Sequence, residues 1–65
     1  MSIGKRIRMA RRIQELSQDE LSEIAGIDKG TLFKIEKGIT SPTWDTVVKV
    51  TRALNISNET IEYFV

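Results

Sequence analysis

The stretch from Leu16 to Gly38 reads LSQDELSEIAGIDKGTLFKIEKG and predicts two short helices joined by a tight turn. Ser17 and Glu20 have the S-x-x-E spacing of a capping box, so the first of these helices is expected to begin there. Gly26 stands where a chain that leaves a right-handed helix most often needs a positive φ. This pattern predicts a helix at about residues 18–25.

The second helix of the stretch is expected at about residues 29–37. Asp28 is a good N-cap for it, and Gly38 marks its end. Leu32 and Ile35 have the spacing of an inner face.

The two helices can cross at a steep angle only if the residue at the crossing is small, and Ser22 meets this condition. Leu21, Ile24 and Ala25 recur at helical spacing on one face, and Ile27 can fill the angle between the helices. With this geometry the second helix can protrude from the domain and enter a groove of another molecule.

Nearly the whole chain, from Ile3 to about Phe64, resembles the helix-turn-helix domain of the lambdoid-phage repressor and Cro proteins, also called the Xre family. The resemblance is carried, in this order, by the segments Ile3–Arg8, Leu16–Leu21, Gly26–Ile27, Ile35–Gly38, Ser41–Thr43 and Asp45–Thr46. Each segment alone is a weak signal, but their combined order and spacing are specific. The resemblance implies an all-α fold, a compact five-helix bundle of the lambda-repressor type, in which the second and third helices read DNA. Residues 1–65 are accordingly expected to form a single helix-turn-helix domain.

The remaining helices are predicted from apolar spacing and capping residues. The first is expected at about 3–14, followed by Glu15, which stands where relatives usually have a helix-ending glycine. A positive φ at Glu15 would cost about 1 kcal/mol. The fourth is expected at 44–54, with inner positions at Trp44, Val47, Val48, Thr51 and Leu54. The fifth is expected to begin at Ser57 and to end at or near Val65.

Composition limits the classes of function. A length of 65 residues permits one domain, and the absence of cysteine and histidine excludes a zinc site of the usual kind. The sequence suggests no cofactor, no small-molecule ligand and no catalytic constellation, so we do not expect an enzyme. No apolar run approaches the roughly 20 residues of a membrane span, and no signal peptide is evident, so a cytoplasmic protein is expected.

The net charge is only +1, but its distribution indicates contact with nucleic acid. Five basic residues and no acid lie within the first twelve positions, and lysines return in the third helix. An ordinary solvated helix face is the alternative for the N-terminal basic run. The outward face of the helices and the family resemblance together predict DNA contacts from Gln18, Lys29, Gly30, Thr31, Phe33, Lys34, Lys37, Thr40 and Arg11.

Individual roles differ among these residues. Lysine can donate to guanine in the major groove, and the family's base-reading positions match Lys29, Gly30 and Lys34. Gly30 can read no base by a side-chain hydrogen bond. Phe33 either packs on a thymine methyl group or folds back toward the loop near Ile39, and these alternatives stay open.

Two further predictions concern a contact with the DNA backbone and an ion pair between helices. Gln18, at the positive end of a helix dipole, is suited to a phosphate, and its match in the family contacts the DNA backbone. By the same resemblance, Arg11 and Glu36 are expected to form an ion pair between the first and third helices. The loop at 39–41, often basic in relatives, contains no basic residue here.

Apolar residues beyond the needs of the core predict a homodimer. Met9, Ile13 and Ile24 occupy positions that are usually polar in relatives. The fifth helix is expected to contribute its interface residues, namely Tyr63, Val65 and Asn58. The favoured function is a sequence-specific regulator of transcription that binds palindromic operators in double-stranded DNA as a dimer. The alternative is a protein-interaction module that kept the fold but lost DNA binding.

Overall fold

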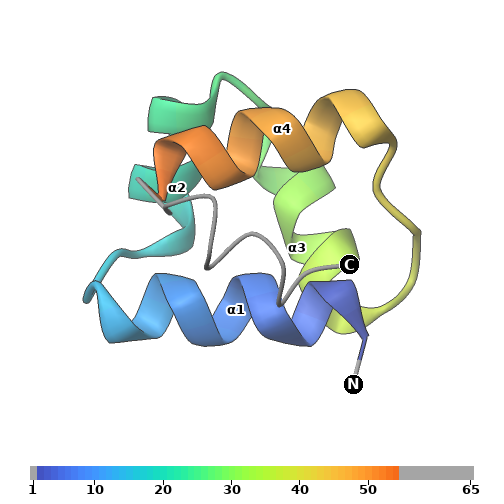
Figure 1. Cartoon of the computed structure of the whole chain (residues 1–65), viewed down its shortest axis with the longest axis horizontal. Coiled ribbons are helices and arrows are strands. Elements are labelled where there is room, and N and C mark those ends of the chain that lie inside the picture. Colours follow the sequence, from blue (N-terminus) through green and yellow to red (C-terminus); the bar gives the residue numbers. More distant parts are fainter. Residues whose placement is uncertain (1, 55–65) are drawn as a thin grey trace.

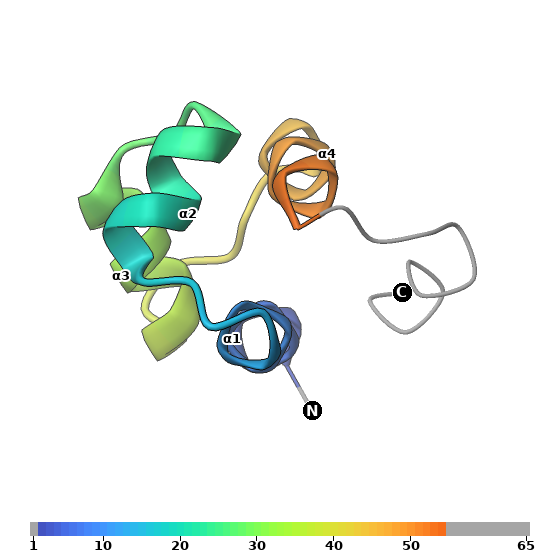
Figure 2. The same cartoon turned by 90° about the vertical axis from the view of Figure 1, so that its left-hand side faces the viewer.

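The structure, a computed structural model, describes residues 2–54 (Figure 1). These residues form four helices. They are α1 (Ile3–Ile13), α2 (Gln18–Ala25), α3 (Lys29–Lys37) and α4 (Trp44–Ala53). In Figure 1, α1 and α4 run in the same direction, and Figure 2 shows α2 and α3 together on one side of them. Helix α3 packs against α1 and α2, and α2 packs against α4.

The capping residues delimit α2 and α3 as predicted. At the start of α2 the amide of Glu20 donates to Ser17 Oγ at 3.0 Å, and the amide of Ser17 donates to Glu20 Oε1 at 3.0 Å. Donation from the Ser17 amide to the Glu20 carboxylate lowers the pKa of Glu20. Asp28 accepts from the amide of Gly30 at 2.9 Å. Both helices end at glycines in the left-handed region, Gly26 with φ 72° and Gly38 with φ 78°, so the backbone follows the predicted helix-turn-helix.

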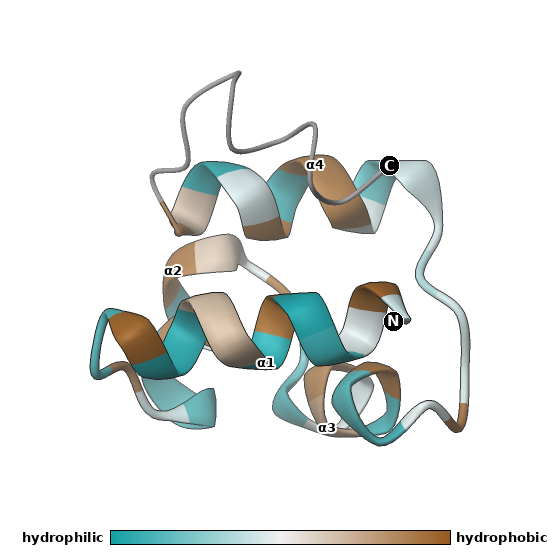
Figure 3. Ribbon diagram, turned by 60° about the horizontal axis from the view of Figure 1, so that its bottom comes forward, coloured by the Kyte–Doolittle hydropathy of each residue, from teal (hydrophilic) through white to brown (hydrophobic). Residues whose placement is uncertain are grey.

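The hydrophobic core joins all four helices. Its fully buried members come from α1, α2, α3 and the end of α4: Ile7, Leu21, Leu32, Ile35, Val50 and Leu54. Figure 3 shows apolar and polar bands in turn along the helices, as expected of helices that bury one face. Ser22 is buried as expected, and its hydroxyl donates to the Asp19 carbonyl at 3.0 Å, so the small residue brings no unsatisfied polar group into the interior. Ile27 packs against the core from the turn, also as expected.

The tightest contact between helices occurs at Gly4, near the start of α1. A Cβ atom built on Gly4 would overlap the main-chain carbonyl oxygen of Ile35 and would lie 3.4 Å from the Cα of Glu36. Only a residue without a side chain permits this approach. The position of α3 against α1 is therefore fixed by backbone contact as well as by the core.

The turn after α1 contains the backbone conformation predicted for Glu15, whose φ is 58°. The amide of Glu15 donates to the carbonyl of Arg12 at 2.9 Å, and the amide of Leu16 donates to the carbonyl of Arg11 at 3.0 Å. These bonds satisfy carbonyls at the end of α1 and offset part of the cost of a left-handed conformation at a non-glycine residue.

The expected five-helix bundle is wrong in its number of helices, because residues 2–54 contain four. The fifth was expected from Ser57 to Val65, which lies outside the described residues. Its prediction came from the family resemblance and one S-x-x-T spacing. A segment this short is marginal as a helix without tertiary packing, so the local sequence alone did not specify it.

One predicted inner residue of α4 is exposed. Trp44 is 68% exposed, whereas the buried positions of α4 are Val47, Val50 and Thr51, with Val50 not anticipated. Trp44 begins α4, and α2 lies beneath the opposite, C-terminal half of that helix (Figure 1), so an apolar stripe is covered only where a partner helix faces it. Ile24, which the sequence places among the apolar residues beyond the needs of the core, is 59% exposed.

No helix among residues 2–54 has both the length and the apolar character needed to cross a membrane.

Candidate nucleic-acid interface

Helix α3 has a buried side and a polar, exposed side. Leu32, Ile35 and Glu36 are buried, the first two in the hydrophobic core. The remaining residues of the helix are all exposed, and three of them are lysines: Lys29, Gly30, Thr31, Phe33, Lys34 and Lys37. These six are the α3 residues for which DNA contact was predicted. The structure therefore brings them together on one accessible, cationic face, which we call the reading face.

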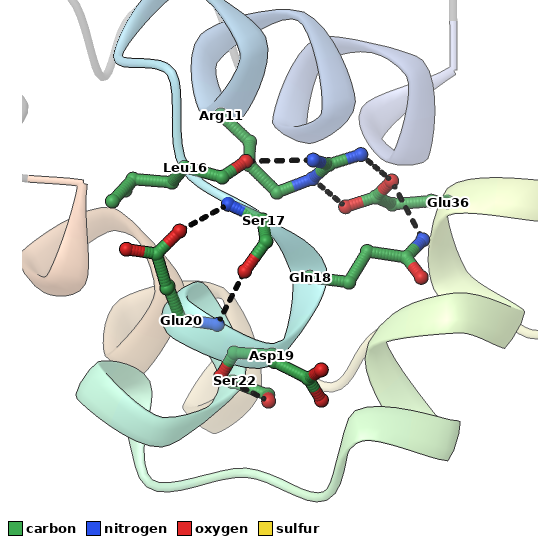
Figure 4. A network of polar contacts seen from close by, with 8 residues as sticks. All are labelled: Arg11, Leu16, Ser17, Gln18, Asp19, Glu20, Ser22 and Glu36. Carbon is green, nitrogen blue, oxygen red and sulfur yellow. Dashed lines mark hydrogen bonds and ion pairs between the residues drawn. The ribbon is translucent and has the colours of Figure 1, made fainter.

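A polar network behind the reading face connects α1, α2 and α3 (Figure 4). Arg11 Nε donates to Glu36 Oε2 at 2.8 Å and Arg11 Nη2 donates to Glu36 Oε1 at 2.9 Å. The predicted ion pair is thus present and has the two-pronged geometry that guanidinium and carboxylate groups favour. Arg11 Nη1 also donates to the carbonyl of Leu16 at 2.8 Å, which ties the pair to the turn before α2.

Burial makes this network more than a surface contact. The side chains of Arg11 and Glu36 are only 11% and 3% exposed. Hydrogen bonding to the Glu36 carboxylate raises the pKa of Arg11 above its ordinary value, while partial burial opposes the shift. The guanidinium therefore stays charged at any physiological pH. The pair fixes the orientation of α3 with a charge that is permanently present.

Gln18 differs in orientation from the sequence-based expectation. Its side-chain amide was expected to point outward at the start of α2. Instead, Gln18 Nε2 donates to Glu36 Oε1 at 3.2 Å, and the side chain is partly buried (Figure 4). Sequence analysis did not anticipate this bond, because only the fold brings residues 18 and 36 together.

Two lysines on the reading face have intramolecular partners. Lys29 Nζ lies 3.1 Å from Asp19 Oδ1, with both side chains largely exposed. Lys37 Nζ lies 5.7 Å from the centre of the Phe33 ring, within the range of a cation–π contact. Phe33 is 43% exposed, so part of its ring remains accessible on the reading face.

The other predicted site residues lie around or beyond α3. Thr40 is exposed in the loop after α3, where its amide donates to the carbonyl of Lys34 at 3.4 Å. The predicted dimer residues Tyr63, Val65 and Asn58 lie outside the described residues.

Arg8 and Arg12 belong to the N-terminal basic run for which nucleic-acid contact is predicted, but the sequence did not single them out. These residues are exposed on α1, one helical turn apart, and they line a hollow together with Arg11, Gln18, Glu36 and Lys37. The signal was available in their i, i+4 spacing, which places both on the same face as each other. It was hidden because five basic residues occur close together at the N-terminus.

Comparisons with known proteins agree with this arrangement. The family model described as Helix-turn-helix matches residues 7–59, so the chain belongs to this helix-turn-helix family. The resemblance to the Xre and Cro type of domain is thereby confirmed.

Two individual relatives match over most of this chain. One is the "Uncharacterized HTH-type transcriptional regulator y4dL" of Sinorhizobium fredii (strain NBRC 101917 / NGR234), 37% identical over 54 residues. The match covers 83% of this chain but only 28% of that relative. The other is the crystal structure of the restriction-modification controller protein C.AhdI from Aeromonas hydrophila, with a TM-score of 0.83 and 27% identity. It covers 91% of this chain and 89% of that one.

Proposed function

We propose that this protein is a transcriptional regulator that binds double-stranded DNA sequence-specifically, with α3 in the major groove. The observation that carries the proposal is the reading face, a set of exposed lysines and small residues on one side of a helix whose other side is buried. A helix of this kind fits the width of the major groove. The similarity to an HTH-type transcriptional regulator and to a restriction-modification controller protein supports the same class.

The residues divide into base-reading and backbone-binding groups. Lys29 and Lys34 are suited to the acceptors of guanine in the major groove, and the exposed edge of Phe33 is suited to a thymine methyl group. Lys37 lies in the last turn of α3, and Arg11 and Gln18 in the network behind it. We assign these last three, with Thr40, to phosphate contacts, which position the protein but carry no sequence information.

We further propose that the protein acts as a homodimer on palindromic operators. A symmetric pair of domains would place two copies of α3 about 34 Å apart along the DNA, one helical turn. Within residues 2–54, five large apolar side chains outside α3 are 50% exposed or more, and three of them, Met9, Ile13 and Ile24 on α1 and α2, support an association through residues that are not part of the reading face.

Selection of bound sequences from a random duplex pool tests sequence specificity and palindromy together. We expect a two-fold symmetric motif with half-sites one helical turn apart. Titration at several salt concentrations tests the underlying electrostatics. If a dimer neutralises roughly six phosphates, the logarithm of the binding constant should fall with the logarithm of the salt concentration with a slope near −5. A slope of zero would exclude DNA binding and favour the alternative of a protein-interaction module.

Alanine variants test the division between base and backbone contacts. We expect Lys34→Ala and Lys29→Ala to relax discrimination at particular base pairs by about 1–3 kcal/mol each. Lys37→Ala should weaken all duplexes alike. Lys49→Ala on α4 is the matched control, because Lys49 is exposed, pairs with Asp45 at 3.2 Å and lies outside the reading face. Uniform weakening by Lys29→Ala and Lys34→Ala would remove them from base reading.

The dimer proposal has its own test. Tyr63→Asp introduces a charge at a predicted interface residue, so we expect monomers in sedimentation and much weaker operator binding with little change in folding. If Tyr63→Asp stays dimeric, the interface does not include this residue, and Ile13→Asp is the next variant to examine.

A further inference from the structure

A basic hollow lies where α1 meets the start of α2 and the end of α3. Its volume is about 160 Å³, and it is lined by Arg8, Arg11, Arg12, Gln18, Glu36 and Lys37. One water occupies about 30 Å³ of liquid, so the hollow has room for a tetrahedral oxyanion. Two of its arginines, Arg8 and Arg12, have no role in the DNA-binding arrangement described above.

The charges of the hollow favour an anion. Four of its side chains are basic and one is acidic, which gives a net formal charge of +3. Both oxygens of Glu36 already accept hydrogen bonds, from Arg11 and Gln18, so the single acid is neutralised within the network. Its carboxylate therefore adds little repulsion toward an incoming anion.

Arg8 and Arg12 offer guanidinium N–H donors that are not used in the Arg11–Glu36–Gln18 network. They lie four residues apart on an exposed face of α1, and the ion pairs found within residues 2–54 involve neither of them. A guanidinium group presents several N–H donors in one plane and binds phosphate oxygens in pairs. Two such groups beside Lys37 can therefore hold one phosphate from two sides.

We infer that this hollow binds one phosphate group of the DNA backbone and that Arg8 and Arg12 are the residues that grip it. The inference rests on the proposed function and extends its contact surface on α1 from Arg11 to Arg8 and Arg12. It also explains how a chain without basic residues in its 39–41 loop holds the DNA backbone. The grip comes from the hollow beside the end of α3, which Lys37, Gln18 and the α1 arginines line.

The test compares two variants with the same loss of charge. Arg8→Gln/Arg12→Gln removes the grip, whereas Lys5→Gln/Arg52→Gln removes two exposed basic residues that do not line the hollow. We expect the first variant to lower the magnitude of the salt slope by about 0.9 per subunit, the value for one lost phosphate contact in B-DNA. Matched and unmatched duplexes should weaken by the same factor. The control variant should keep more of the wild-type slope, and both should unfold at the wild-type urea concentration.

Equal slopes for the two variants would overturn the inference while leaving the proposed function intact. If the wild-type protein binds no duplex, both proposals fail. A titration with inorganic phosphate alone, followed by NMR of the arginine Nε–H groups, separates the sources of the anion. Saturable shifts at Arg8 and Arg12 without duplex binding would make free phosphate the ligand and overturn the assignment to DNA.

Discussion

The two sides of α3 differ in how firmly their polar groups are held. On the buried side, Glu36 is 3% exposed and accepts three hydrogen bonds from Arg11 and Gln18. On the reading face, Lys29 and its partner Asp19 are 57% and 71% exposed and share one contact of 3.1 Å. A buried, multiply bonded pair is costly to break, whereas an exposed single pair contributes about 0–1 kcal/mol.

This difference suggests that the buried side of α3 positions the helix and that its reading face serves the recognition of DNA. The buried side fixes the angle of α3, so changes there should alter stability and DNA affinity together. The reading face contributes little to folding, so changes there should alter binding and leave stability nearly constant. Each prediction below tests one side against the other.

Gly4→Ala should have the largest effect on stability. The added Cβ would overlap the Ile35 carbonyl, so α1 and α3 would have to separate, and overpacking of this kind costs about 1–3 kcal/mol or more. Urea unfolding measures the loss. Gly30→Ala is the comparison variant, because a Cβ there would meet at 2.8 Å only a side-chain atom, the Asp28 oxygen that caps α3, and displacing a cap costs about 1 kcal/mol. A Gly4→Ala variant as stable as Gly30→Ala would show that the backbone contact does not set the helix positions.

Arg11 and Glu36 provide the next largest effect. Arg11→Met or Glu36→Leu alone should cost a few kcal/mol, because each leaves an uncompensated charge in a largely buried place. The double variant should recover much of the stability but not the affinity for DNA. Because hydrogen bonding to Glu36 raises the pKa of Arg11, the pair's contribution to stability is lost only as the pH rises far into the alkaline range, and it should stay constant around neutral pH.

A double-mutant cycle in urea measures the coupling between these two residues. The control cycle uses Lys49→Met and Asp45→Leu, an exposed i,i+4 pair on α4. We expect the control coupling to be about 0.3–0.5 kcal/mol. Additive effects of Arg11→Met and Glu36→Leu would contradict a role for the pair in fixing α3.

Local signals in the sequence were sufficient for the helix-turn-helix itself. Whereas the strain at Glu15 was inferred from the family resemblance, the caps at Ser17 and Asp28 and the glycines that end α2 and α3 each depend on residues within a few positions. Such features are specified by short-range geometry and hydrogen bonding, so they can be read directly. The Arg11–Glu36 pair was predicted too, but only through the family resemblance, because the residues are 25 positions apart.

What could not be predicted depends on contacts between distant segments. The exposure of Trp44 follows from the position of α2 under the other half of α4. The spacing of apolar residues along α4 does not predict this position. The need for glycine at position 4 follows from the approach of α1 to the Ile35 carbonyl, 31 residues away. The bond from Gln18 to Glu36 and the hollow beside Arg8 and Arg12 exist only after three helices have assembled.

Glu15→Gly should raise stability without changing DNA affinity. Glycine adopts a φ of 58° without the steric cost that falls on glutamate, so we expect a gain of about 1 kcal/mol in urea unfolding. Glu15 is exposed and its amide bonds to Arg12 on α1, so a stabilised protein should bind its operator with wild-type affinity. Glu15→Ala is the control, because it removes the charge but keeps the strain. A change in affinity with Glu15→Gly would show that binding follows overall stability, and the comparison between the two sides would fail.

The smallest effect on stability is expected from Asp19→Asn on α2, which removes the partner of Lys29 on the reading face. Loss of an exposed ion pair should change the free energy of unfolding by less than about 1 kcal/mol. Binding should respond more, because the Asp19 carboxylate neutralises Lys29 and repels DNA phosphates. We expect Asp19→Asn to tighten binding to every duplex and to reduce discrimination between matched and unmatched sites.

Glu23→Gln, the same charge change elsewhere on α2, controls for net charge. The gain should vanish in a Lys29→Ala background. If it persists there, or if Glu23→Gln produces the same gain, then Asp19 acts only through overall charge and does not tune the lysine beside it.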